Sequence, residues 1–338
     1  MTSAQSRVVF LTGAAGGIGL CMMTDALLAA DHRVAAVDRD AKALDRLSAR
    51  HATTKDRLHP ILADLANAAG CERAVAAARA RFGAIEAVIN NAGIGMSSMR
   101  PDAEARAPGI EELTPEIWDG FMAIFVRAPL ILVRAALPDM KQRGFGRVIN
   151  NTTSYVTMLR VLPYGAAKAT LESTSAVWAK ELDGSGITVN VLVPGGPTDT
   201  PLIADESGWP RDKMLRPEIM GPPTAWLVSD EAKNFSGRRI TAARWDKNLP
   251  AAEAAARAKP RHRLARAFRR RRLADWRKGL GANGSNHPLC CHPNAAATAL
   301  PQATVFAAPP RSPVRSFGSA STCSIALTID AAASPSPR

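Results

Sequence analysis

The chain contains 338 residues, with 43 Lys and Arg against 30 Asp and Glu, for a formal net charge of +13. A hydrophobic content of 46% and a mean hydropathy of -0.07 are typical of a folded globular protein and exclude disorder along the whole length. No run approaches 18 consecutive apolar residues, so we expect no membrane span.

Short apolar runs alternate with helix-like segments before residue 250. The predicted strands are 7–12, 33–37, 58–63, 87–90, 147–150 and 187–193, with a weaker candidate after Arg238. The predicted helices lie around 17–30, 40–50, 67–82, 115–140 and 164–183. Several strands are apolar throughout, as parallel strands covered on both faces are. The pattern predicts an α/β fold, a doubly wound parallel sheet of about seven strands with helices on both faces.

A glycine-rich turn follows the first predicted strand and leads into a helix. Its residues are Thr12, Gly13, Ala14, Ala15, Gly16, Gly17, Ile18 and Gly19. Glycines let the backbone turn tightly and approach a pyrophosphate, which the free N–H groups of a helix N-terminus bind. The strand–turn–helix context therefore predicts a dinucleotide site, with a purely structural turn as the alternative.

Polar residues end or follow the next three strands. Asp38 is positioned to accept hydrogen bonds from adenosine ribose hydroxyls and to repel a 2′-phosphate, which favours NAD. Its neighbour Arg39 could receive that phosphate, so NADP stays open as the less favoured cofactor. Further along the chain come Asp64-Leu65 and Asn90-Asn91-Ala92-Gly93, at the carboxyl ends of strands where open α/β sheets bind ligands.

Tyr164 and Lys168 are four residues apart on a predicted helix, so their side chains share one face. A nearby ammonium favours the phenolate and lowers the pKa of a tyrosine from about 10. We therefore expect Tyr164 to exchange protons near neutral pH, with Lys168 tuning it and holding the nicotinamide ribose. An ordinary pair of helix neighbours is the alternative.

Taken together, these residues resemble the short-chain dehydrogenase/reductase family. TGxxxGxG matches Thr12–Gly19, NNAG matches Asn90–Gly93, YxxxK matches Tyr164–Lys168, and a strand-end PG matches Pro194-Gly195. The resemblance spans residues 7–245 and implies a single Rossmann domain that transfers hydride between a nicotinamide cofactor and a secondary alcohol or ketone. It also implies that Thr198 or Thr200 contacts the nicotinamide amide. Homodimers or homotetramers, built through the helices near 115–140 and 164–183, are implied as well.

Two positions depart from the family pattern. The family's serine, which hydrogen-bonds the substrate oxygen, aligns with Thr153, and Ser154 follows it; either hydroxyl could serve. Phe125 stands where the family has an asparagine that helps to hold a water in the proton relay. Because phenylalanine neither donates nor accepts hydrogen bonds, we expect slower proton exchange. A degenerate member that binds nucleotide as a regulatory or scaffold protein is the competing hypothesis.

The positive charge is concentrated near the carboxyl end. Residues 261–338 hold 12 basic and two acidic residues, a net of +10, which leaves +3 for residues 1–260. A stretch rich in Pro, Ser and Ala follows, and it buries too little apolar surface to offset the entropy lost on ordering. The sequence thus predicts a folded domain over 1–250 and a largely disordered extension over 251–338.

Two further features of the sequence bear on partners and location. Five apolar residues form a loose stripe among arginines: Leu264, Phe268, Leu273, Trp276 and Leu280. This segment could form an amphipathic helix that contacts nucleic acid, a membrane or a partner, although we favour a solvated extension. A nucleic-acid binder through 261–278 is thus a minor hypothesis. The spacing of the five cysteines fits neither a zinc site nor a set of disulfides: Cys21, Cys71, Cys290, Cys291 and Cys323. We therefore expect no metal site and a reducing, cytoplasmic location.

Overall fold

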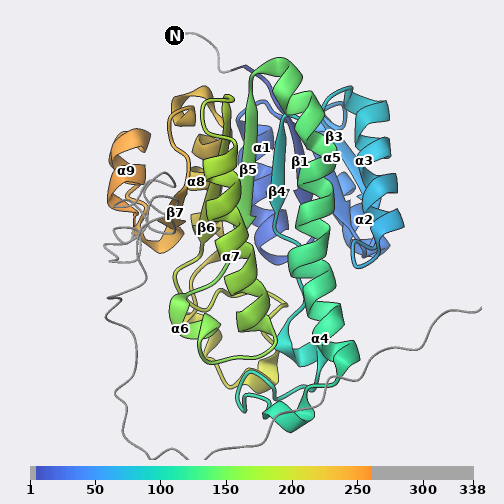
Figure 1. The fold of residues 1–338 in the computed structure, drawn as a ribbon, viewed down its shortest axis with the longest axis vertical. Coiled ribbons are helices and arrows are strands. Elements are labelled where there is room, and N and C mark those ends of the chain that lie inside the picture. Colours follow the sequence, from blue (N-terminus) through green and yellow to red (C-terminus); the bar gives the residue numbers. More distant parts are fainter. Residues whose placement is uncertain (1–4, 260–338) are drawn as a thin grey trace, which may run out of the picture. The chain divides into compact units, whose positions relative to one another are not determined.

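Seven parallel strands form one sheet, in the order β3-β2-β1-β4-β5-β6-β7 (Figure 1). The computed structural model describes residues 5–259. The strands are β1 Val8–Thr12, β2 Arg33–Asp38, β3 Leu58–Leu62, β4 Ala87–Asn90, β5 Gly146–Asn151, β6 Ile187–Val193 and β7 Arg238–Thr241. The predicted doubly wound sheet is confirmed, including the weak seventh strand.

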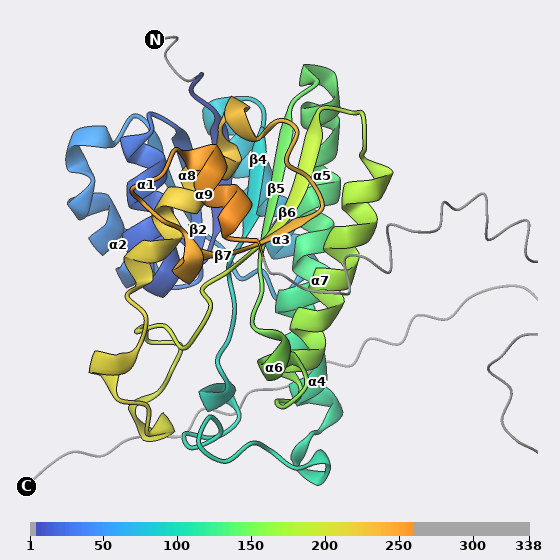
Figure 2. The ribbon, with the colours of Figure 1, turned by 90° about the vertical axis from the view of Figure 1, so that its left-hand side faces the viewer.

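Helices cover both faces of the sheet (Figure 2). Packed on one face are α1 Asp25–Ala29, α2 Ala41–Arg50, α8 Gly221–Val228 and α9 Ala251–Arg257. The other face carries α3 Ala68–Phe82, α5 Ala128–Arg143 and α7 Tyr164–Glu181, while α4 Pro115–Met122 and α6 Tyr155–Met158 lie at the carboxyl end of the sheet. The helices on the two faces enclose two apolar clusters, one on each side of the strands.

Strand β1 shows why these strands are apolar throughout. Successive side chains of a strand point to opposite faces. Val9 and Leu11 pack with α1 and α8, whereas Val8 and Phe10 pack with α3 and α5. All four are at most 1% exposed, and each contributes about 1.5–3 kcal/mol relative to an exposed position.

The strand order reverses between β1 and β4, and this reversal positions the site. From β1 the chain continues to β2 and β3 on one side, and from β4 to β7 on the other. The two central strands pair directly, with Leu11 opposite Ile89. Their carboxyl ends therefore bring the glycine-rich turn beside Asn90–Gly93, in the crevice where such sheets bind ligands.

Helices α2, α3 and α4 each begin at a residue whose side chain caps the helix N-terminus. Asp40 accepts a hydrogen bond from the Ala43 N–H at the start of α2, and Asn67 accepts one from Gly70 at the start of α3. Thr114 caps α4, with Pro115 in the first turn. Caps of this kind contribute about 1 kcal/mol each, so they fix where the chain turns from loop to helix.

Three helices were not predicted, and one of them moves the domain boundary. Helices α6 and α8 are short, and α8 begins with consecutive prolines. Helix α9 buries Ala254 and Ala255, and the Thr241 N–H donates to the Ala258 carbonyl at 3.1 Å. Small alanine side chains pack closely here, so the folded domain continues past residue 250. The rest of the predicted extension, with its arginine stripe, lies outside the described residues.

One helical stretch of the described residues, Pro115–Arg143, is long and apolar enough to cross a membrane by length and composition alone. It comprises α4, a π-helical turn at Ala123–Arg127 and α5. Phe121, Leu132 and Ala136 are buried within the domain. Packing in the core thus accounts for much of its apolar character.

Candidate functional site

The glycine-rich turn packs tightly against the end of β4. Gly13 has a φ of +62°, and a Cβ there would lie 2.9 Å from the Ala92 Cα. A side chain at this position would therefore strain the backbone and collide with Ala92. A Cβ at Gly16, by contrast, would meet no atom of the described part of the chain within 4 Å. The turn is closed toward the sheet and open on the side where a pyrophosphate would lie.

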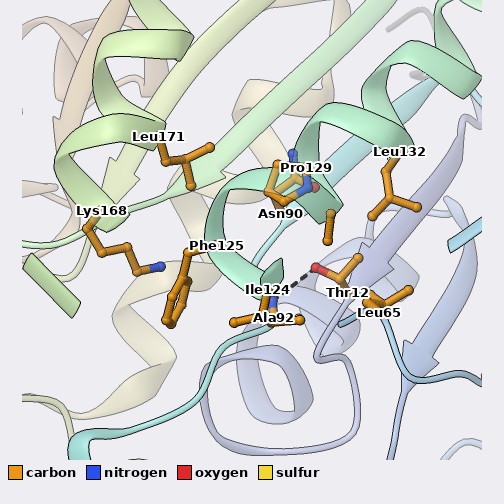
Figure 3. Close-up of a pocket in the computed structure, with 11 residues that line it drawn as sticks. Thr12, Leu65, Asn90, Ala92, Ile124, Phe125, Pro129, Leu132, Lys168 and Leu171 are labelled. Atoms are coloured by element: carbon orange, nitrogen blue, oxygen red, sulfur yellow. Dashed lines mark hydrogen bonds between the residues drawn. The ribbon is translucent and has the colours of Figure 1, made fainter. Parts of the chain in front are cut away.

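Thr12 and Asn91 lock the ends of β1 and β4 together. The Thr12 hydroxyl accepts a hydrogen bond from the Asn91 N–H at 2.9 Å and one from the Ala92 N–H, also at 2.9 Å, which Figure 3 shows. The Asn91 amide donates to the carbonyls of Thr12 and Gly13 at 3.1 Å. Asn91 belongs to the predicted NNAG run but was not singled out, since its role depends on a partner 78 residues away.

Asp38, the residue predicted to bind the adenosine ribose, lies beside the glycine-rich turn. Its Oδ2 accepts a hydrogen bond from the Ala15 N–H at 3.0 Å, and its Oδ1 accepts one from Asp40 at 3.2 Å. Each carboxylate oxygen has a second lone pair to offer. At the end of β3, Asp64 accepts from the Ala66 N–H at 2.9 Å, and Leu65 is buried.

Asn90, a predicted cofactor contact, lies at the end of β4 and joins a chain of side-chain hydrogen bonds. Its amide donates to Asn150 Oδ1, and the Asn150 amide donates to the Ser175 hydroxyl, both at 2.7 Å. This chain ties β4 to β5 and α7 beneath the site. Within residues 5–259, the buried Asn90 Oδ1 has no hydrogen-bond partner.

Asn90 also lines a small cavity that Thr12, Phe125 and Lys168 share (Figure 3). The volume that the centre of a water molecule can occupy in this cavity is about 10 Å³, which is enough to hold one water. Asn90 Oδ1 is thus an acceptor available to a water in that space.

The residues Asn151–Thr153, here called the β5 exit, meet the reacting residues of α7. The Lys168 ammonium donates to the Asn151 carbonyl at 2.7 Å. The Thr153 hydroxyl forms a side-chain hydrogen bond with the Tyr164 phenol. The Ser154 hydroxyl instead accepts from the Thr157 N–H at 3.1 Å and caps α6. Of the two predicted hydroxyls, Thr153 is therefore the one that faces Tyr164.

Burial sets the pKa values of both reacting residues. It raises the pKa of Tyr164 to about 12, although the hydrogen bond from Thr153 acts in the opposite direction. Burial also lowers the pKa of Lys168 to about 7. The expected lowering of the Tyr164 pKa by the ammonium is therefore wrong. Lys168 Nζ bonds to a backbone carbonyl and lies 5.7 Å from the Tyr164 ring centroid, so desolvation dominates.

Phe125 fills the space between the end of β4 and α7. It is 2% exposed, and its ring packs edge-on against Tyr164 with 5.3 Å between centroids. Lys168 Nζ lies 4.3 Å from the centroid of the Phe125 ring. A Cβ at Gly93 would approach the Phe125 Cε1 to 2.6 Å, so this aromatic side chain requires the glycine beside it. Phe125 thus forms an apolar wall against the ammonium.

The chain after β6 crosses to the glycine-rich turn. Pro194 and Gly195 follow directly on β6, and Gly195 has a φ of +108°. Thr198 donates to the Gly196 carbonyl at 3.2 Å. Thr200 packs on Gly17, where a Cβ would lie 3.2 Å from the Thr200 Cβ. Of the two predicted threonines, Thr200 therefore touches the phosphate end of the site.

Two loops border the reacting end, at 94–114 and 198–216. Arg211 holds the second loop by ion pairs with Asp199 at 3.1 Å and Asp205 at 2.6 Å. The loops touch each other, because a Cβ at Gly95 would lie 2.4 Å from the Leu202 carbonyl oxygen. They are therefore placed to shape a substrate pocket, as loops at such sheet ends do.

Known proteins resemble this chain in both sequence and fold. Residues 7–210 match the sequence profile of short chain dehydrogenases. The 2-(R)-hydroxypropyl-CoM dehydrogenase of Xanthobacter autotrophicus is 37% identical over 248 residues, which cover 70% of this chain and 94% of that protein. A 3-ketoacyl-(acyl-carrier-protein) reductase from Brucella melitensis, solved with NADH, has a TM-score of 0.60 and 25% identity, covering 70% of this chain and 96% of that one. A blue fluorescent protein from a metagenomic library, solved with NADPH, has a TM-score of 0.60 and 26% identity, covering 70% and 95%.

The burial of Lys168 leads to a prediction of how the free energy of unfolding depends on pH. Its pKa is about 7 in the folded chain and near 10.4 when unfolded, so the unfolded chain binds the extra proton between these values. The free energy of unfolding should therefore rise with pH across this window. We expect Lys168→Met to flatten that rise and to be more stable than the wild type at pH 7. Urea unfolding at several pH values measures this. The exposed Lys180→Met is the control, and parallel curves for wild type and Lys168→Met would contradict the prediction.

Proposed function

The chain belongs to the short-chain dehydrogenase family of oxidoreductases, and we propose that it is an NAD-dependent enzyme that interconverts a secondary alcohol and the matching ketone. The observation that carries this proposal is the meeting of Thr153, Tyr164 and Lys168 at the carboxyl ends of the central strands. By their names, two of the similar proteins act on a 2-hydroxypropyl and a 3-ketoacyl compound, a secondary alcohol and a ketone, which supports this substrate class.

The crevice fits a nicotinamide dinucleotide. The glycine-rich turn, open above Gly16, would hold the pyrophosphate, and Asp38 beside it would hold the adenosine ribose. We also assign to the cofactor four residues that follow β3 and β4 at the same edge of the sheet: Asp64, Leu65, Ala92 and Gly93. When bound, the nicotinamide ring supplies or accepts the hydride. Lys168 is placed to hold the second ribose, and Thr200 lies against the glycine-rich turn.

Tyr164 is the proton donor in the direction of ketone reduction. With a pKa of about 12, the phenol is protonated at neutral pH and can donate to the substrate oxygen. Thr153 is a second donor to that oxygen and stabilises the charge that develops on it. Lys168 approaches half protonation near pH 7, so it could exchange a proton with a water held in the small cavity that it lines.

A second candidate function is nucleotide binding with little catalysis, as a regulatory or scaffold protein. Phe125 favours it, because this ring occupies the space beside Lys168 and offers no hydrogen bond. Tight NADH binding with no turnover of any alcohol or ketone would support this function. Turnover gained in Phe125→Asn would then identify Phe125 as the cause.

We also propose a homodimer or homotetramer that uses α5 and α7. Leu130 on α5 and Val177 on α7 are 50% and 59% exposed, so each helix has a large apolar side chain that such an interface could bury. Sedimentation of the purified chain tests this proposal, and a monomer at micromolar concentration would contradict it.

Substitutions at the reacting end test the mechanism. Tyr164→Phe should lower kcat by about 100-fold or more, since it removes the proton donor, while NADH affinity in a fluorescence titration stays the same. Thr153→Ser should retain most activity and Thr153→Val should lose it. Ser154→Ala is the matched control, and a larger loss in Ser154→Ala than in Thr153→Val would reverse the assignment of the two hydroxyls.

Substitution of Asp38 tests the proposed preference for NAD over NADP. Removing its charge in Asp38→Asn should raise the ratio of kcat/KM for NADP to that for NAD by about 10-fold or more, because a carboxylate repels the 2′-phosphate. Asp45→Asn, on the exposed side of α2, is the control. An unchanged ratio in Asp38→Asn, or a wild type that already prefers NADP, would refute the proposed choice of NAD.

A further inference from the structure

We infer that the ion pair between Glu172 and Arg239 is a positioning unit for Thr153, which holds the hydroxyl of that residue toward the substrate oxygen. The inference deepens the proposed function and rests on it. Neither residue belongs to a motif, and neither is placed in contact with cofactor or substrate.

The pair brings α7 and β7 together beneath the β5 exit. Glu172 lies one turn beyond Lys168 on α7, and Arg239 is the second residue of β7. Arg239 Nε lies 2.9 Å from Glu172 Oε1, and the two side chains are only 11% and 16% exposed. Water therefore screens this ion pair poorly.

Both partners of the pair also bind the backbone or side chains of the β5 exit. The Arg239 guanidinium donates through Nη2 to the Thr153 carbonyl. The Thr152 hydroxyl donates to Glu172 Oε2 at 2.9 Å. Two consecutive residues are thus fixed by one ion pair, and the second of them forms the hydrogen bond with Tyr164.

Tyr155 contacts both members of the ion pair. The Arg239 guanidinium lies over its ring, with 4.3 Å from Cζ to the centroid. Its phenol forms a hydrogen bond with Glu172, and burial followed by the charge of Glu172 raises the pKa of Tyr155 to about 12. The guanidinium is thereby held between an aromatic face, a carboxylate and a carbonyl.

The end of the sheet explains why Thr153 needs such support. Strand β5 ends at Asn151, and the Thr152 N–H still donates to Leu192 of β6 at 3.1 Å. Thr153 lies beyond that ladder, so strand pairing does not hold it. Because χ1 of a threonine is restricted, the position of its hydroxyl depends closely on its backbone. By holding the Thr153 carbonyl, Arg239 therefore limits where the hydroxyl can lie.

The stability of the fold does not by itself require an ion pair at this position. Apolar side chains of similar volume often stabilise a fold as well as a buried ion pair does. The bonds of Glu172 and Arg239 instead converge on the two residues before the α6 cap. A displacement of about 1 Å at a reacting group can cost about 100-fold in rate, so such fixation has a catalytic effect.

A double-mutant cycle tests the inference on the full-length chain, with NADH and a ketone that the wild type reduces. The variants are Arg239→Met, Thr153→Ala and both together. Arg239→Met should lower kcat by one to two orders of magnitude and leave NADH affinity unchanged. In the Thr153→Ala background it should cost at most about twofold more, since Arg239 acts through Thr153. Arg239→Lys should restore only part of the activity, because a compact ammonium cannot both donate to the Thr153 carbonyl and lie beside Glu172 and the Tyr155 ring, as the planar guanidinium does.

Matched variants separate positioning from folding. Arg79→Met breaks an ion pair with Asp139, also at 2.9 Å, which lies between α3 and α5 away from the site, and it should leave kcat unchanged. If Arg239→Met does not fold, Glu172→Gln and Thr152→Val replace it in the cycle with the same expected coupling to Thr153→Ala. Thermal unfolding is measured for every variant.

The outcomes distinguish this inference from the proposed function. Equal losses from Arg239→Met in the wild-type and the Thr153→Ala backgrounds, or an unchanged kcat in Arg239→Met, overturn the positioning role while the proposed reaction stands. Failure of the wild type to reduce any ketone overturns the proposed function, and the inference falls with it.

Discussion

The hydrogen bond from Lys168 to the Asn151 carbonyl joins the reacting helix to the end of β5, and the rest of the site depends on it. The same Asn151 donates through its amide to Asn91 Oδ1 at 2.9 Å. Asn91 in turn donates to the Gly13 carbonyl in the glycine-rich turn. A continuous path of hydrogen bonds thus runs from the ammonium of α7 across three strand ends to the place where a pyrophosphate would lie. The phosphate end and the reacting end are positioned by one network.

Desolvation, rather than a neighbouring opposite charge, sets the proton chemistry of this site. Lys168 is 4% exposed and faces the Phe125 ring and a backbone carbonyl. A buried ammonium without a carboxylate partner loses its proton easily, and a buried phenol keeps its proton. Tyr164 therefore begins as an acid, which suits ketone reduction. Phe125 strengthens this effect because its ring places an apolar wall beside the ammonium.

Much of the fold and part of the site could be predicted from the sequence because the signals are local. Each strand is a short apolar run, and the glycine-rich turn and the Tyr164–Lys168 pair are contiguous or one helical turn apart. The sequence profile confirms the family that these motifs indicate. Other roles could not be predicted, because each depends on a partner that is distant in the sequence. These are the roles of Asn91, Asn151 and the Glu172–Arg239 pair. Arg239 and Thr153, for instance, are 86 residues apart.

The direction of the Tyr164 pKa shift could not be predicted for a related reason. Spacing shows that an ammonium is near the phenol, but only the fold shows how completely both groups are removed from water. The folded domain also extends past residue 250, because alanines that look featureless in the sequence pack closely in α9.

The most direct test of this account is the effect of Asn151→Leu on NADH affinity and on kcat at saturating NADH. This variant keeps the carbonyl that Lys168 binds but removes the amide that holds Asn91. If one network positions both ends, the dissociation constant of NADH should rise and kcat should fall together. A change in kcat alone, with NADH affinity and thermal stability equal to those of the wild type, would contradict the account.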